Sequence, residues 1–133
     1  MSSLVADTHA VLWSLYERGR LPKDAQAAFE QAAAAGDPVY LSAISIVEVR
    51  YLVEKFRLSA EVLDGLLRAI DAEDGRLSVV SVDLDIARMM HRIPRELVPD
   101  MPDRIIAATA LHLDLPLVTG DARIRSSPIT TIW

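Results

Sequence analysis

The sequence predicts an α/β protein with a short parallel β-sheet sandwiched between helices. Short runs of Leu, Ile and Val alternate with longer helical segments, and these runs are apolar throughout, without alternating polar residues. Strands buried on both faces have this pattern, which is typical of parallel sheets covered by helices on each side. The chain of 133 residues shows no repeat, linker or change of composition, so residues 1–133 are expected to form a single domain.

The first half of the chain is predicted to contain two strands and four helices. Thr8 is a candidate N-cap for the first helix, and Ser42 is one for the third. Gly36 is expected to end the second helix, and Asp37-Pro38 to form the turn after it. The expected elements are a strand at 4–6, helices at 8–16 and 23–35, a strand at 39–41, and helices at 42–56 and 60–72.

The second half is predicted to contain three more strands. Asp74-Gly75 forms a turn, Pro94 ends a helix, and Pro102 suits the first turn of another helix. The expected elements are a strand at 77–80, helices at 84–93 and 102–114, a strand at 115–119, a helical turn at 121–125 and a strand at 129–132.

Composition limits the class of protein. Apolar residues make up 51% of the chain and aromatic residues only 5%, so the core is expected to consist of Ala, Leu, Ile and Val. The absence of cysteine excludes a disulfide framework and fits a reducing compartment. No apolar run reaches the roughly 18 residues of a membrane helix, and the N-terminus lacks the pattern of a signal peptide. We therefore expect a soluble cytoplasmic protein.

The charge balance argues against one class of nucleic-acid binder. The net charge is −5, from 14 basic and 19 acidic residues. Proteins that bind duplexes tightly and without specificity are usually basic. A nuclease whose bound cations supply positive charge remains compatible with this balance.

Four acidic residues stand at the borders of apolar segments, where an ionised carboxylate is costly unless it is paired or holds a metal. Asp7 follows the first strand and Asp121 the fourth, Asp103 lies in the first turn of a helix, and Glu48 lies one turn after the second strand. Because the carboxyl ends of parallel strands share one edge of a sheet, these four acids are expected to meet there. Carboxylate oxygens favour Mg²⁺ or Mn²⁺ over Zn²⁺.

Each acid also has an ordinary structural interpretation. Asp7 can be a helix N-cap, and Glu48 can close a capping box with Ser45. Asp103 can simply favour the positive end of a helix, and Asp121 can be a turn residue. The joint placement of all four at one end of a sheet favours the metal site.

Other polar and aromatic side chains are weaker candidates. Arg104 and Arg123 stand beside the acidic segments and can contact phosphates or form ion pairs with the acids. His9 is interpreted as a packed or helix-surface residue, and Trp13 as a core or dimer contact.

The four acidic segments resemble those of a PIN domain, and most of all the VapC-type ribonucleases of toxin–antitoxin pairs. The resemblance rests on LVADTHAVLW at 4–13, SAISIVE at 42–48, PDRIIAATA at 102–110 and LVTGD at 117–121, and it covers essentially the whole chain. In one departure from the family pattern, the proline of Asp100-Met101-Pro102-Asp103 stands one residue further on. This leaves the role of Asp100 open.

The resemblance implies a fold and an activity. It implies a PIN-like parallel sheet and Mg²⁺- or Mn²⁺-dependent cleavage of single-stranded RNA. It also implies a homodimer and inhibition by a small VapB-like antitoxin, in a larger toxin–antitoxin assembly. Its catalytic, metal-binding acids correspond to Asp7, Glu48, Asp103 and Asp121, and its supporting hydroxyls to Thr8 and Thr119.

Two alternatives stay open at this point. A phosphatase of the haloacid dehalogenase type also has an aspartate after its first strand, but it needs a second acid at the position of His9 and a lysine later than Lys55, and the chain has neither. A non-catalytic metal-binding interaction module with the same fold is the other alternative.

Overall fold

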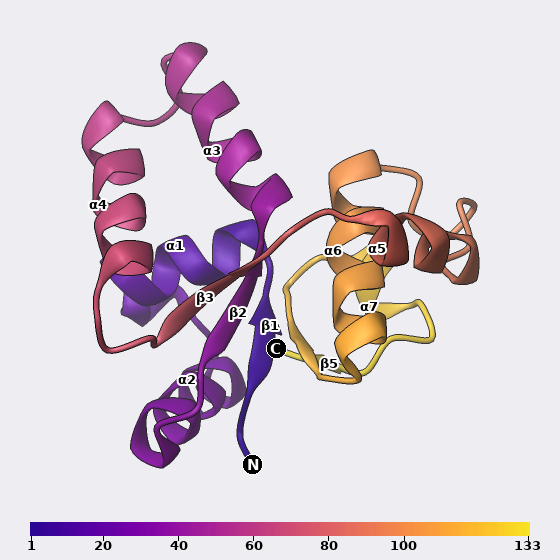
Figure 1. Cartoon of the computed structure of the whole chain (residues 1–133), viewed down its shortest axis with the longest axis horizontal. Helices are drawn as coiled ribbons and strands as arrows, with labels where there is room; N and C mark the ends of the chain where they lie inside the picture. The colour runs from indigo at the N-terminus through magenta and orange to yellow at the C-terminus, as the bar shows by residue number, and fades with distance from the viewer.

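The computed structural model describes residues 1–133 and has five parallel strands, seven α-helices and two short 3₁₀ helices (Figure 1). The predicted α/β class is therefore confirmed. The strands are β1 (Leu4–Ala6), β2 (Val39–Ser42), β3 (Leu77–Val80), β4 (Leu117–Val118) and β5 (Thr131–Ile132). The helices are α1 (Thr8–Tyr16), α2 (Lys23–Ala35), α3 (Ala43–Glu54), α4 (Ala60–Asp71), α5 (Leu84–Met89), α6 (Met101–Leu113) and α7 (Ala122–Arg125), with 3₁₀ turns η1 (Arg18–Arg20) and η2 (Met90–Arg92).

The strand order places a topological switch beside β1. The order is β3-β2-β1-β4-β5, and every neighbouring pair is parallel. The chain builds outward from β1 through β2 to β3, and then returns to the other side of β1 with β4. In open parallel sheets, ligands bind beyond the carboxyl ends of the strands at such a switch.

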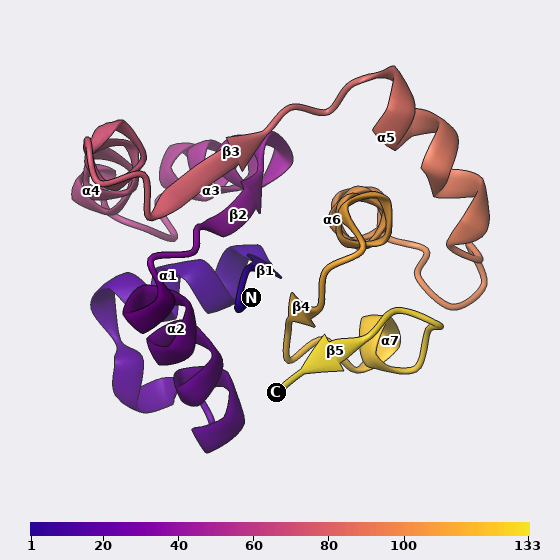
Figure 2. The same ribbon diagram turned by 60° about the horizontal axis from the view of Figure 1, so that its bottom comes forward.

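Helices cover both faces of the sheet, and the strand residues alternate between them. Helices α1 to α4 lie on one side, and α5 to α7 lie on the other (Figures 1 and 2). Leu4 and Ala6 of β1 belong to the core under α1 to α4, whereas Val5 belongs to the core under α6 and α7. Both faces of β1 are thus buried, which explains why its sequence is apolar at consecutive positions.

The last two strands are shorter than the sequence predicts. The residues at 115–119 give a strand only at Leu117–Val118, because the Leu115 N–H donates to Ala110 at the end of α6 and Pro116 has no N–H. The strand expected at 129–132 begins only at Thr131. The helix expected at 84–93 tightens into the 3₁₀ turn η2 after Met89. None of the helices has the length and apolar content needed to cross a membrane.

Candidate active site

Asp7 lies at the topological switch between β1 and β4. Its backbone N–H donates to the Val118 carbonyl at 3.1 Å, which joins it to β4. Its Oδ1 accepts from the Ala10 N–H at 2.8 Å, so Asp7 is the N-cap of α1, and the prediction that Thr8 caps this helix is wrong. Its Oδ2 accepts from the Thr119 hydroxyl. Asp7 is only 8% exposed, and these hydrogen bonds join it both to α1 and to the β4 side of the switch.

The loop after β4 brings Thr119 and Asp121 to the same place. The buried Thr119 hydroxyl donates to Asp7 and accepts from the Asp121 N–H at 3.0 Å. Asp121 is the N-cap of α7, where its Oδ1 accepts from the N–H groups of Arg123 and Ile124 at 2.9 and 3.0 Å. Asp121 therefore has the structural role at a turn that its sequence position suggests. These bonds use Oδ1, and Oδ2 of Asp121 has no protein partner.

Glu48 does not form a capping box. Ser42 caps α3, with its side chain accepting from the Ile44 N–H at 3.2 Å, as the sequence predicts. The Glu48 Oε1 instead lies 2.7 Å from the Thr8 hydroxyl oxygen, which lies 2.8 Å from Ser45 Oγ. The Thr8 hydroxyl has a single proton and can donate only one hydrogen bond. Both contacts are therefore hydrogen bonds when Ser45 donates to Thr8 and Thr8 donates to Glu48.

Ser45 supports the site through its hydrogen bond to Thr8, whereas the sequence suggests for it only a role in a helix cap. It is fully buried, and it lies on α3 one turn before Glu48. Serine three residues before glutamate looks like a helix start, and only the packing of α1 against α3 reveals that its hydroxyl faces Thr8. The i, i+3 spacing, which places both side chains on one face of a helix, was the available signal.

Asp103 is the least compensated of the acids. It lies in the first turn of α6, where the sequence places it, next to Pro102. Asp100 is the N-cap of this helix and accepts from the Asp103 N–H at 3.2 Å. Burial raises the pKa of Asp103 to about 7, with further contributions from the charges of Asp100, Asp121, Glu48 and Asp7. The structure thus gathers all four predicted acids, with Asp100 as a fifth member.

Burial also raises the pKa of Asp7 and of Glu48. For Asp7, burial outweighs the hydrogen bonds from Thr119 and Ala10, which lower the pKa. For Glu48, burial outweighs the hydrogen bond from Thr8. Each of these carboxyls would ionise more readily if a positive charge stood among them.

The donor set fits a hard divalent cation. The gathered side chains are carboxylates, so they offer oxygen atoms as ligands and give this place an excess of negative charge. The carboxylate of Asp103 accepts no hydrogen bond. No group of three His, Cys, Asp or Glu side chains lies close enough together to hold a metal ion on its own. An ion at this place would also need oxygens from water or substrate, and Mg²⁺ is usually held by one or two carboxylates together with waters and the substrate phosphate.

The two candidate arginines differ in their placement. The Arg104 guanidinium donates to the carbonyls of Met90 and Ile93 at 2.9 and 3.0 Å, so it joins α6 to the segment around η2. Neither the phosphate contact nor the ion pair predicted for Arg104 agrees with this orientation. Arg123 is exposed beside Asp121 and remains a candidate for contacting phosphate. His9 is exposed at the start of α1, as the helix-surface interpretation predicts.

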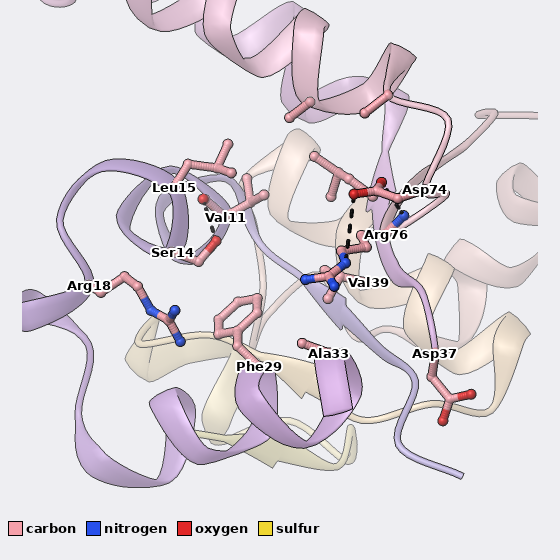
Figure 3. A pocket seen from close by; sticks show the side chains of 13 residues that line it. Val11, Ser14, Leu15, Arg18, Phe29, Ala33, Asp37, Val39, Asp74 and Arg76 are labelled. Carbon is pink, nitrogen blue, oxygen red and sulfur yellow. Dashed lines mark hydrogen bonds and ion pairs between the residues drawn. The ribbon is translucent and has the colours of Figure 1, made fainter. Parts of the chain in front are cut away.

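The cavity in Figure 3 lies away from these acids. It has a volume of about 280 Å³. Val39 and Leu77, the first residues of β2 and β3, line it, and so does Phe29 of α2. Because the acids lie beyond the carboxyl ends of the strands, this cavity is at the opposite end of the sheet.

Comparison with known proteins identifies the family. Residues 4–128 match the PIN domain. The chain is 31% identical over 139 residues to Ribonuclease VapC22 of Mycobacterium tuberculosis (strain ATCC 25618 / H37Rv), and the match covers the whole of both chains.

Solved structures share the fold. One is the VapBC2 complex of Rickettsia felis bound to a DNA fragment from its promoter, with a TM-score of 0.72 and 17% identity over 97% of this chain and 96% of the other. Another is a toxin–antitoxin complex of Klebsiella pneumoniae, with a TM-score of 0.65 and 21% identity over 98% and 96% of the two chains. With its five-stranded sheet, its acids at the switch point and a match over nearly its full length, the chain belongs to the PIN domain family, in which it resembles the VapC ribonucleases.

Proposed function

We propose that this chain is a metal-dependent endoribonuclease toxin that cleaves single-stranded RNA and is inhibited by a cognate antitoxin. The observation that carries the proposal is the gathering of Asp7, Glu48, Asp103 and Asp121 at the strand switch, with a pKa of about 7 at Asp103. We propose that residues 1–133 act as one domain, and the packing of both helical layers on the same sheet supports this. The proposed setting is a homodimer in the cytoplasm.

Asp7 and Asp103 are the proposed principal ligands of a Mg²⁺ or Mn²⁺ ion, with Glu48 and Asp121 completing the shell directly or through water. When bound, such an ion stabilises charge on the phosphoryl oxygens and lowers the pKa of a coordinated water. The protein positions these carboxylates: Thr119 orients Asp7, and Thr8 with Ser45 orients Glu48. A carboxylate not engaged by the ion can orient the attacking water, so no histidine base is required.

A cleavage assay separates this proposal from its alternatives. Purified protein should cleave single-stranded RNA when Mg²⁺ or Mn²⁺ is present, and chelation by EDTA should stop it. Turnover of a small phosphate ester without cleavage of RNA would indicate a phosphatase. Turnover of neither substrate would indicate a non-catalytic module.

Glu48→Gln should lose RNA cleavage and weaken Mn²⁺ binding, with little change in melting temperature. Glutamine keeps an oxygen that can accept from Thr8, so the packing of α1 against α3 is preserved while the negative charge is lost. Calorimetric Mn²⁺ titration and thermal melting measure both effects. Glu54→Gln, an exposed position on the same helix, is the control. Full activity with unchanged Mn²⁺ affinity would remove Glu48 from the site.

One groove of this chain is the proposed binding site of the antitoxin. The structures of similar fold include toxin–antitoxin complexes. In this chain, a groove of about 280 Å³ runs between α1, α3 and α4, beginning at His9 near the acids. Such a groove can accept an amphipathic helix. It is lined by His9, Leu12, Trp13, Tyr16, Glu17, Arg20, Leu52, Leu58 and Val62.

We expect a basic side chain of this partner to enter the acidic site and displace the ion, since clustered carboxylates bind guanidinium or ammonium groups. The purified complex should be inactive at low Mg²⁺ and partly recover as Mg²⁺ rises. Cleavage assays across a Mg²⁺ series measure this. A complex that is fully active, or whose inhibition changes neither with Mg²⁺ nor with mutation of the partner's basic residues, would contradict it.

A further inference from the structure

Trp133 packs directly on Gly120, in the loop that carries two of the site residues. A Cβ atom added to Gly120 would come within 2.6 Å of Cε2 and Cζ2 of the Trp133 indole, and 3.0 Å of its Nε1. Gly120 does not have a positive φ; among the glycines, only Gly36 and Gly75 do. Glycine at 120 is therefore explained by the close approach of the indole, because its backbone conformation is open to other residues.

The same indole also contacts α1, which Asp7 caps. The rings of Trp133 and Trp13 have their centroids 5.7 Å apart, at an interplanar angle of 40°. On Trp13, in turn, the Arg20 guanidinium lies 4.3 Å from the ring centroid. Trp133 thus fills the space between α1 and the loop of residues 119–121.

The same loop is hydrogen-bonded to β5 and to Asp7. The Thr119 N–H donates to the Ile132 carbonyl at 3.1 Å, in the strand that leads to Trp133. The Thr119 hydroxyl connects Asp7 to the Asp121 backbone. A shift of Gly120 would therefore move both the donor to Asp7 and the carboxylate of Asp121.

We propose that Trp133 is a positioning residue for RNA cleavage, whose indole packs on Gly120 and holds Thr119 and Asp121 against Asp7. Trp133 acts through this loop and contacts neither the ion nor the RNA. The inference rests on the proposed nuclease function, and it concerns the placement of Asp121 and its effect on metal affinity.

Two variants disturb this contact from opposite sides. Trp133→Ala removes the indole, and Gly120→Ala forces it away, since a side-chain carbon at 120 has no room beside it. Each should lower kcat for RNA by about 10²-fold, the cost of displacing a positioned group by about 1 Å, with a smaller change in KM. Each should also weaken Mn²⁺ affinity in the absence of RNA, as measured by calorimetry.

Matched controls separate positioning from general destabilisation. Gly19→Ala places a Cβ where no atom lies within 4 Å, so its activity should equal that of the wild type. Trp133→Phe keeps an aromatic ring on Gly120 and should recover much of the activity that Trp133→Ala loses. Circular dichroism and thermal melting verify that each variant is folded.

Double variants test whether the contact acts as stated. Adding Gly120→Ala to Trp133→Ala should cost nothing more, because the indole that the new Cβ would strike is gone. Likewise, Asp121→Asn should lower kcat much less in the Trp133→Ala background than in the wild type. A purely structural tryptophan would give additive losses in both pairs.

The outcomes are distinct. Wild-type kcat and Mn²⁺ affinity in folded Trp133→Ala, or additive losses in either double variant, would overturn the inference. If Trp133→Ala fails to fold, Gly120→Ala and Trp133→Phe decide, and full activity with unchanged Mn²⁺ affinity in Gly120→Ala would overturn it. If the wild type cleaves no RNA, the proposed function fails, while the Mn²⁺ affinities of the same variants still test the positioning of Asp121.

Discussion

Asp103→Asn should abolish RNA cleavage and, without metal, stabilise the protein at neutral pH. Asparagine keeps the shape of the side chain but removes the charge that burial and four neighbouring carboxylates disfavour. The expected gain is ~1 kcal/mol, discounted because Asp103 is partly exposed. This corresponds to roughly 3–5 °C in melting temperature for a chain of this size.

The gain should depend on pH in a defined direction. Because the folded pKa of Asp103, about 7, lies above the ordinary value of 3.8, the folded state binds more protons than the unfolded state between these values. The stability of the wild type should therefore fall as pH rises from about 4 to 7. Asp7 and Glu48, whose pKa values are also raised, act in the same direction.

Thermal melting of both proteins at pH 5 and pH 8 in EDTA measures this effect. The difference between them should be less than half as large at pH 5 as at pH 8, because the unfolded carboxyl is already ionised at pH 5 while the folded one is not. Asp64→Asn, which removes an exposed carboxylate on α4, is the control and should change neither activity nor pH dependence. A variant that cleaves RNA at the wild-type rate would show that Asp103 is not a ligand.

The positions of the acids follow from local sequence patterns. Asp7 directly follows a buried strand, and Pro102 marks the helix start that places Asp103 in its first turn. Parallel strands then bring their carboxyl ends together, so the gathering of Asp7 and Asp121 is a consequence of topology. For this reason the sequence predicts both the fold class and the end of the sheet at which the acids meet.

The contacts that orient these acids depend on packing between distant segments. Thr8 meets Ser45 across 37 residues of sequence. The i, i+3 spacing places Ser45 and Glu48 on one face of α3, but no local pattern shows that this face packs against Thr8. The guanidinium of Arg104 points to carbonyls near η2, although its neighbour in sequence is Asp103. Trp133 meets Gly120 only because β5 pairs with β4 and returns the chain to the loop.

Mn²⁺ should bind the wild type much more weakly at pH 6 than at pH 8. With a folded pKa of about 7, Asp103 is mostly protonated at pH 6 and mostly ionised at pH 8. An ion that uses this carboxylate must displace its proton, so the dissociation constant should rise roughly tenfold between these pH values. The raised pKa values of Asp7 and Glu48 add to the same trend.

Calorimetric titration in two buffers of different ionisation enthalpy measures both the affinity and the protons released. We expect proton release to be greatest below pH 7 and to be largely lost in Asp103→Asn, which has no carboxyl proton to displace at this position. At a Mn²⁺ concentration 100 times its dissociation constant, the ion should stabilise the folded protein by about 2.7 kcal/mol, provided that it does not bind the unfolded chain. Equal affinity at both pH values, with no proton released, would mean that the ion binds away from Asp103, and the gathered acids would then have to be explained by the ordinary capping and turn roles of Asp7 and Asp121.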